Sequence, residues 1–317
     1  MKRKCLYCYE PLGEEERYHQ RCSRSFFGQI HPPIMPHRFD QIERQGRRMT
    51  DRHISIPGVQ AKISLHIVKD GLRTGHSRLE TGAGPGASFI FKPPAKHFRE
   101  MPENEHLSMQ LAKAYGIPVV PSSLIRMASG ELAYIARRID RDPRRGKLHM
   151  LDMFQITQAF DKHKSSMEKV GQAIHLHSAN PWLDKVYFFE VSLFSFLTGN
   201  NDMHLKNFSM VKKPYGWVLA PAYDLLNVAL VLPEAREELA LSMHGKKSKF
   251  NRADFEALGA SLQLTTKQVK AAFHRMQRNR PLADDWVENS FLTREMKDAY
   301  LAVMDKRYKQ LNLHHCA

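Results

Sequence analysis

The segment GNNDMHLKNFS, residues 199–209, carries the densest functional signal in this chain. It follows a long apolar run and is rich in turn-forming residues, so it is predicted to be a loop. Asp202 and Asn207 stand five positions apart within it. This Asp-x₄-Asn spacing would supply a carboxylate for an attacking hydroxyl and an oxygen ligand for magnesium, the groups that phosphoryl transfer requires. The alternative is a turn without chemistry, because the spacing alone is common.

A second carboxylate follows this loop. Residues 216–223 form a short, mostly apolar run that is typical of a strand, and it ends at Asp224. Magnesium prefers hard oxygen ligands and takes only a few of them from a protein. Asn207 and Asp224 are therefore the candidate magnesium ligands, with Asp202 as the catalytic base. The alternative is a strand-end aspartate that caps a helix.

Two charged residues in the first half of the chain fit the same chemistry. The apolar run 89–91 ends at Lys92, which could reach nucleotide phosphates, and Glu105 on the following predicted helix is its natural partner. Upstream, residues 55–62 form a tight turn in which Gly58 permits close approach of the backbone to a phosphate. The alternative is an edge lysine with a solvent-facing glutamate.

Three of the four cysteines lie within the first 22 residues, together with a histidine. The spacing Cys5-x₂-Cys8-x₁₀-His19-x₂-Cys22 resembles a short zinc knuckle, since zinc favours tetrahedral sulfur and nitrogen ligands. Four protein ligands would make a structural site with no position open for catalysis. Reduced thiols on a loose terminus are the alternative. Because no catalytic motif lies in this segment, phosphoryl transfer is expected to survive its deletion.

The predicted elements change character along the chain. A β-rich half followed by a helical half predicts an α+β fold with two lobes. The expected parts are a zinc knuckle at 1–28, a linker or arm at 29–52, a β-rich lobe at 53–141 and a mostly helical lobe at 142–317. Strands are expected at 53–56, 62–68, 88–91, 119–127 and 131–137, and helices at 103–114, 150–160, 181–197, 252–262, 266–278 and 293–311.

Composition limits the class of protein. The chain has 317 residues and a formal net charge of +15, which favours attraction to nucleic acid or to acidic partners. No apolar run is long enough to span a membrane, and no signal-peptide region follows the basic start. A cytoplasmic protein without membrane association is expected.

The ordered motifs resemble the HipA family, bacterial serine/threonine kinases that act as toxins of toxin–antitoxin modules. The matching strings are SIPGVQAK at 55–62, FIFKP at 89–93, ENEH at 103–106, RIDR at 138–141, the 199–209 loop and APAYD at 220–224. The resemblance begins near Ile54 and covers most of the chain. It implies a two-lobed, protein-kinase-like fold of the HipA type that uses ATP and Mg²⁺.

The resemblance also implies roles for individual residues. Asp202 would be catalytic, and Asn207 and Asp224 would hold magnesium. The nucleotide-binding residues would be Ser55, Ile56, Pro57, Gly58, Val59, Gln60 and Ala61 in the phosphate loop, Lys92 with Glu105, Ala136, Arg137, Arg138 and Ile139 in the hinge that holds adenine, and His204 and Lys206 in the catalytic loop. Ser55 matches the serine that the family autophosphorylates, and its modification is expected to switch the kinase off. Pro57 and Ala61 depart from the family's usual residues.

Partners follow from the same resemblance. The β-rich domain that precedes the kinase core of HipA proteins is expected to be absent, so the chain looks like a short, kinase-core form. The implied partners are a protein substrate such as an aminoacyl-tRNA synthetase, a small antitoxin that bridges to DNA, and a separately encoded N-terminal-domain protein. Two other classes stay open: a small-molecule kinase on a related two-lobe fold, and a non-enzymatic, zinc-bearing nucleic-acid binder.

Overall fold

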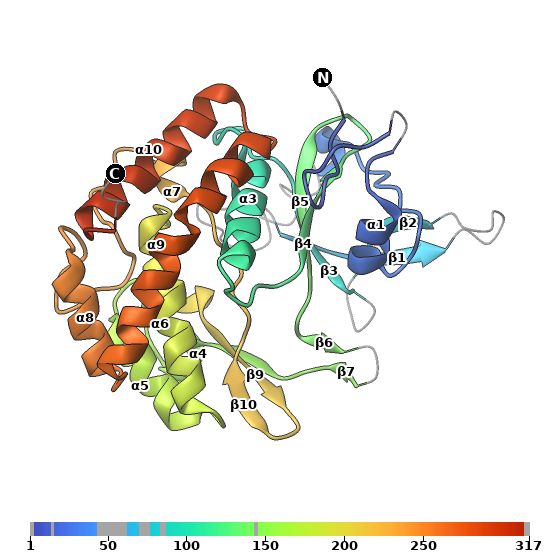
Figure 1. The fold of residues 1–317 in the computed structure, drawn as a ribbon. Coiled ribbons are helices and arrows are strands. Elements are labelled where there is room, and N and C mark those ends of the chain that lie inside the picture. Colours follow the sequence, from blue (N-terminus) through green and yellow to red (C-terminus); the bar gives the residue numbers. More distant parts are fainter. Residues whose placement is uncertain are drawn as a thin grey trace. The chain divides into compact units, whose positions relative to one another are not determined.

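The computed structural model describes residues 3–13, 16–42, 62–69, 77–82, 87–142 and 145–313. The chain divides into two compact units (Figure 1). The first unit comprises Met1–His106, Val120–Arg141 and Asn289–Phe291, and the second comprises Leu107–Val119, Asp142–Glu288 and Leu292–Ala317. The cysteine-rich segment and the β-rich segment therefore belong to the same unit.

An antiparallel sheet of five strands forms the centre of the first unit. Its strands in spatial order are β2 (Ser77–Thr81), β1 (Ile63–Lys69), β3 (Phe89–Lys92), β5 (Leu132–Arg137) and β4 (Ser122–Arg126). The register pairs Phe91 with Ile135 and Lys92 with Tyr134. Successive residues of a strand face opposite sides of the sheet. Because Phe91 and Lys92 are both buried, both faces of β3 are covered at its end.

Two helices accompany this sheet. Helix α1 (Gln20–Phe27) ends at Gly28, whose φ of 76° lets its N–H close the last turn on the carbonyl of Arg24. Helix α3 (Met101–Ala114) begins in the first unit and enters the second unit at Leu107. Figure 1 shows α1 beside the strands of the first unit.

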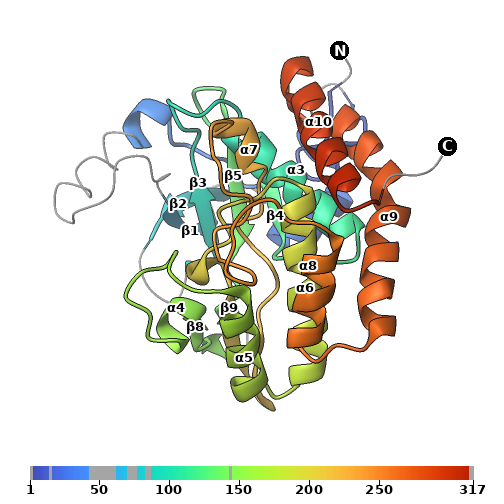
Figure 2. The same ribbon diagram turned by 90° about the vertical axis from the view of Figure 1, so that its left-hand side faces the viewer.

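The second unit is built around α6 (Pro181–Leu197). Phe188, Phe189 and Phe194 of this helix are fully buried, as expected for a helix inside a helical core. Figure 2 shows α5 (Met167–His177) and α8 (Arg252–Ser261) beside it. Helix α10 (Arg294–Gln310) contacts both α6 and α7 (Val228–Val231), and α9 (Thr266–Asn289) packs Phe273 edge-on against Phe189. No helix in the described part of the chain is both long and apolar enough to cross a membrane.

A small antiparallel sheet brackets the 199–209 loop. Its order is β10 (Gly216–Leu219), β9 (Ser209–Lys213) and β8 (Met150–Asp152), and β8 leads into the short α4 (Met153–Ile156). Strand β9 begins at Ser209, the last residue of the loop. Strand β10 ends at Leu219, a few residues before Asp224. A two-stranded hairpin, β6 (Arg141–Asp142) and β7 (Gly146–Lys147), comes before this sheet in the sequence.

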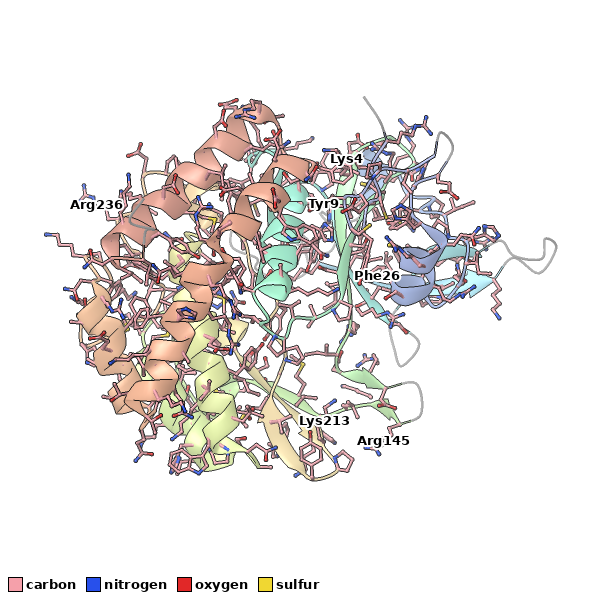
Figure 3. All side chains as sticks on the ribbon, in the orientation of Figure 1. Lys4, Tyr9, Phe26, Arg145, Lys213 and Arg236 are labelled. Atoms are coloured by element: carbon pink, nitrogen blue, oxygen red, sulfur yellow. The ribbon has the colours of Figure 1, made fainter. Side chains whose placement is uncertain are left out.

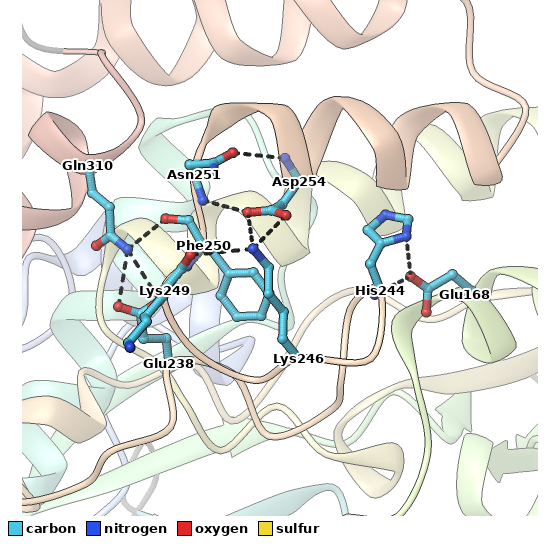
Figure 4. A network of polar contacts seen from close by, with 9 residues as sticks. All are labelled: Glu168, Glu238, His244, Lys246, Lys249, Phe250, Asn251, Asp254 and Gln310. Atoms are coloured by element: carbon cyan, nitrogen blue, oxygen red, sulfur yellow. Dashed lines mark hydrogen bonds and ion pairs between the residues drawn. The ribbon is translucent and has the colours of Figure 1, made fainter.

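A polar network fixes the segment between Asp224 and α8 (Figure 4). Asn251 caps α8 through a reciprocal pair of hydrogen bonds with Asp254, which also accepts a 2.7 Å hydrogen bond from Lys246. Gln310 of α10 donates to both carboxylate oxygens of Glu238. The start of α8 and the end of α10 are thereby tied to this segment.

Most of the expected elements are present, with several differences. Strands at 62–68, 88–91, 119–127 and 131–137 and the helix at 103–114 are confirmed with small shifts of their ends, whereas 53–56 lies outside the described residues. The single helix expected at 150–160 is wrong, because β8 pairs with β9 before Asp152 caps α4. Helix α9 continues through Pro281, because the buried Ala283 and Val287 anchor its last turns. Strand β2 and helix α5 were not expected, nor were the shorter elements α1, β6, β7, β9 and α7.

Candidate active site

The 199–209 loop begins with a turn that requires glycine. Helix α6 ends at Leu197, and Gly199 adopts a φ of +72°. A Cβ atom at this position would lie 2.6 Å from Cγ1 of Val303 and 2.8 Å from Oδ1 of Asn227, closer than atoms pack. Glycine supplies both the left-handed backbone and the missing side chain. The exit of the loop from α6 is therefore fixed.

Hydrogen bonds hold Asp202 and Asn207 together. The Nδ2 atom of Asn207 donates to the backbone oxygen of Asp202 over 2.8 Å, and the N–H of Asp202 donates to Oδ1 of Asn200 over 3.2 Å. The last residues of this span form the 3₁₀ helix η1 (Leu205–Asn207). Asn207 is buried, whereas 51% of the Asp202 side chain is exposed. A fixed backbone thus presents a carboxylate that an incoming hydroxyl can reach.

His204 is a buried, neutral imidazole beside this carboxylate. Only 7% of the residue is exposed, and its Nε2 lies 4.0 Å from Oδ1 of Asp202. Burial, followed by the charges of Lys162 and His163, lowers the pKa of His204 to about 4. The imidazole of His204 is therefore uncharged near neutral pH.

Asp224 occupies a left-handed backbone conformation, with a φ of +60°. A non-glycine residue in this region carries strain of order 1 kcal/mol. The preceding Tyr223 connects it to the loop, because the Tyr223 hydroxyl bonds the carbonyl of Lys206 at 3.0 Å and the hydroxyl of Ser209 at 2.5 Å. Asp224 also acts electrostatically on His204. The second unit thus brings together Asp202, His204, Asn207 and Asp224.

In the first unit, Lys92 and Glu105 form a buried ion pair. Nζ of Lys92 lies 2.6 Å from Oε1 of Glu105, and the two side chains are 7% and 2% exposed. Lys92 ends β3, and its Nζ also lies 5.3 Å from the centre of the Tyr134 ring, in reach of a cation–π contact. The expected pairing is present, and the alternative of a solvent-facing glutamate is wrong.

The predicted hinge, Ala136 to Ile139, comprises the last two residues of β5 and the two residues after it. Nε of Arg137 donates to the carbonyl of Phe26 over 2.6 Å. Arg138 makes a bidentate ion pair with Asp140, with hydrogen bonds of 2.9 and 2.8 Å. Both arginine side chains are thus engaged within the first unit, and adenine recognition by this stretch stays a prediction.

The predicted phosphate loop lies outside the part of the chain that the structure describes. Its residues are Ser55, Ile56, Pro57, Gly58, Val59, Gln60 and Ala61. Their roles stay predictions.

The cysteine and histidine side chains of the first unit converge. One ligand atom from each of Cys5, Cys8, His19 and Cys22 lies within 4.8 Å of every other. The sulfurs of Cys8 and Cys22 are 3.4 and 3.8 Å from Nδ1 of His19. Cys5, Cys8 and Cys22 are free thiols. The structure therefore gathers all four predicted zinc ligands.

Three residues in or next to the 199–209 loop were not singled out by the sequence. Asn200 and Tyr223 stand inside the motif strings, so the pattern contains them, but only the structure shows that their side chains fix the loop. His163 comes from the segment after α4 and packs its ring edge-on against His204 at 5.0 Å. It carries no signal in the sequence.

Comparisons with protein families and with individual proteins agree on what the chain is similar to. Residues 54–283 match the family described as HipA-like C-terminal domain. The chain is similar to "Putative kinase Y4dM" of Sinorhizobium fredii, at 30% identity over 234 residues that cover 68% of this chain and 55% of that protein. It is also similar to a "Putative kinase" of Haemophilus influenzae, at 27% identity over 290 residues and 82% of each chain. The matched region thus spans about half of the first relative and most of the second.

The fold has a solved counterpart. The HipA chain of Shewanella oneidensis MR-1, determined in a toxin–antitoxin complex with HipB and operator DNA, superposes with a TM-score of 0.68 at 20% identity. The match covers 89% of this chain and 73% of that chain. At this identity the likeness concerns the fold. It confirms the α+β class and the similarity to HipA.

Proposed function

Because the chain belongs to the HipA-like C-terminal domain family, we propose that it is a kinase that transfers the γ-phosphate of ATP to serine or threonine hydroxyls of a protein. The observation that carries this proposal is the hydrogen bond from Asn207 to the backbone of Asp202, which fixes the loop while the Asp202 carboxylate stays half exposed. Two relatives of the chain carry the name "Putative kinase", which supports the same reaction.

In the proposed reaction, Asp202 orients the substrate hydroxyl and accepts its proton. The hydroxyl oxygen then bonds to the γ-phosphorus, and the bond from that phosphorus to the β–γ bridging oxygen breaks. The bridging oxygen keeps the electron pair and leaves with ADP. Neutral His204 suits this step, because it does not draw the carboxylate into an ion pair.

The donor set fits magnesium. Since Nδ2 of Asn207 donates to Asp202, its Oδ1 remains as an oxygen donor, and Asp224 adds a carboxylate. Two such oxygens suit Mg²⁺, which keeps its other positions for water and phosphate and neutralises phosphate charge when bound.

We propose that Lys92, held in place by Glu105, contacts the ATP phosphates, and that His204 and Lys206 also contact the nucleotide. The backbone of the 136–139 stretch would receive adenine, and the 55–61 loop would cover the phosphates. In this proposal the β-rich residues 53–141 serve the nucleotide and residues 142–317 supply the catalytic loop.

A toxin–antitoxin setting is proposed with the kinase activity. The fold match to a HipA chain solved with HipB and operator DNA supports a small antitoxin as partner, through which DNA would be reached. The substrate would be a protein such as an aminoacyl-tRNA synthetase, and a separately encoded N-terminal-domain protein would join the complex. A small-molecule kinase on a related fold is the competing function.

Autophosphorylation would distinguish the proposed protein kinase from a small-molecule kinase. After incubation of the full chain with Mg²⁺–ATP, mass spectrometry is expected to find phosphate on Ser55, and the phosphorylated form should bind ATP more weakly. A phosphate there adds close to two negative charges beside the proposed triphosphate site. Ser55→Ala should remain unmodified at this position and keep its ATP affinity. Absence of phosphate on Ser55, or unchanged affinity after modification, would contradict the switch.

We also propose that Cys5, Cys8, His19 and Cys22 hold one structural zinc ion. Tetrahedral ligands at about 2.3 Å from zinc lie roughly 3.5–3.8 Å from one another, and the sulfurs of Cys8 and Cys22 stand at 3.4 and 3.8 Å from Nδ1 of His19. Nε2 of His19 donates to the carbonyl of Pro11 over 3.0 Å, which leaves the Nδ1 lone pair for the metal.

The zinc proposal has a direct measurement. Elemental analysis of protein purified without added metal is expected to give about one zinc per chain, as closed structural sites do. Cys8→Ser should lower that content strongly, whereas Cys316→Ser, which removes the one cysteine outside the cluster, should leave it unchanged. Zinc-free wild-type protein, or equal zinc in both variants, would rule the site out.

A further inference from the structure

The cysteine segment covers the outer edge of the five-stranded sheet. Strand β4 is the last strand in the order, so its outer edge has no strand neighbour in the described sheet. The carbonyl of Leu6, between Cys5 and Cys8, accepts hydrogen bonds from the N–H of Leu124 at 3.1 Å and from Oγ of Ser123 at 3.2 Å. Open strand edges are sites of mispairing that folded proteins cover. Leu6 therefore caps this strand edge, and in the sequence it lies between two of the proposed zinc ligands.

The same segment abuts the helix that carries Glu105. Tyr9 follows Cys8 directly, has a φ of +65° and is buried. Its hydroxyl lies 2.9 Å from Nδ1 of His106, and its ring packs edge-on against the His106 ring at 5.3 Å. His106 is fully buried and is the immediate neighbour of Glu105. The turn that bears two of the proposed zinc ligands thus braces the first half of α3.

A third contact reaches the strand that carries Lys92. Cys22 lies in α1, and at the end of this helix Phe26 and Phe27 pack against Phe89 of β3 at ring distances of 5.7 and 6.0 Å. Figure 3 shows that the side chains of Tyr9 and Phe26, both from the N-terminal segment, lie at different places in the first unit. The proposed metal ligands are therefore linked to β3, β4 and α3.

This segment is too short to hold its own shape. Among its described residues, 3–13 and 16–28, the one helix or strand is the eight-residue α1, and isolated helices of that length are unstable in water. Segments of this size need a metal or disulfide to fix their conformation, and the three cysteines within it are free thiols.

We infer that the zinc-bound segment is a metal-dependent brace of the first unit, which keeps the β4 edge covered and Glu105 aligned with Lys92. The inference rests on the proposed zinc site but not on the kinase activity. It predicts that deletion of the segment weakens activity, contrary to the expectation drawn from its lack of catalytic motifs, and that expectation stays untested. Loss of the metal should loosen β4 and the start of α3, and it should weaken nucleotide binding through the Lys92–Glu105 pair.

Hydrogen exchange on the full chain tests the brace. Zinc-loaded wild type, Cys8→Ser and Cys316→Ser are compared by mass spectrometry. In Cys8→Ser, amides of Ser122–Arg126 and of the first turns of α3 are expected to exchange at least about tenfold faster, because they open locally. Helices α8 and α10 of the second unit serve as internal references and should not change. Cys316→Ser should match the wild type throughout.

Two further measurements keep the test decisive. If Cys8→Ser does not fold, a strong zinc chelator added to the folded wild type should produce the same local acceleration. Tyr9→Phe, with zinc retained, should accelerate exchange at the start of α3 but not in β4. Zinc loss without faster exchange in either element would overturn the brace. A zinc-free wild type would overturn both the site and the brace, and neither outcome depends on catalysis.

Discussion

Asp202→Asn is expected to lower the rate of phosphoryl transfer by about 10²–10⁴-fold, the range that a general base contributes. The affinity for Mg²⁺–ATP should stay within about twofold of wild type, because the proposed magnesium ligands and Lys92 remain in place. The amide is close in shape to the carboxylate, and the hydrogen bond from Asn207 goes to the Asp202 backbone. The loop should therefore keep its conformation while losing its proton acceptor.

The measurement is single-turnover transfer with radiolabelled ATP, alongside calorimetric titration with Mg²⁺–ATP. Asp298→Asn is the matched control, because Asp298 is exposed and pairs with Arg294 one turn away on α10. Surface pairs of this kind contribute little to stability, so this variant should behave as wild type. Wild-type transfer rates in Asp202→Asn would remove Asp202 from the role of base.

Lys92→Met is expected to reduce the free energy of unfolding by about 3–5 kcal/mol, because it leaves the charge of Glu105 buried without its cation. Nucleotide affinity should fall as well, since the proposed phosphate contact is lost. Lys92→Met/Glu105→Leu removes both charges and should regain much of that stability. It should not regain nucleotide affinity. Stability and function therefore separate in the double variant.

Denaturant unfolding and nucleotide titration on the three proteins provide the check. Lys96→Met, four residues further along, is the control for loss of a lysine outside the pair. A single variant as stable as wild type would show that the pair is not buried as described. A double variant that binds Mg²⁺–ATP with wild-type affinity would exclude Lys92 from the nucleotide site.

The residues that carry the proposed chemistry were the most predictable part of the molecule. The Asp202 to Asn207 spacing, the Lys92–Glu105 pairing and the cysteine cluster each depend on a short string, and each is brought together as expected. Their contacts are either local or follow from one helix and one strand that the sequence marks clearly.

The helices and strands that were not predicted correctly from the sequence depend on distant partners or on weak sequence patterns. Residues 150–152 form a strand only because β9, far along the chain, supplies its hydrogen bonds. Strand β2 is short and polar, with Leu79 as its apolar anchor, so it shows little alternation. Helix α5 did carry a signal, since Met167, Val170 and Ile174 are buried at helical spacing behind a Ser166 cap. The electrostatic effect of Lys162 on His204 has no counterpart in any sequence pattern.

The left-handed backbone at Asp224 sets stability against activity at a single position. Glycine would adopt the same conformation without the strain of a side chain. It would also delete a carboxylate proposed to bind magnesium. A library selected only for heat resistance should therefore accumulate glycine at 224, whereas one selected for phosphoryl transfer should keep the acid. The residue found at position 224 after selection would therefore show whether stability or activity was selected.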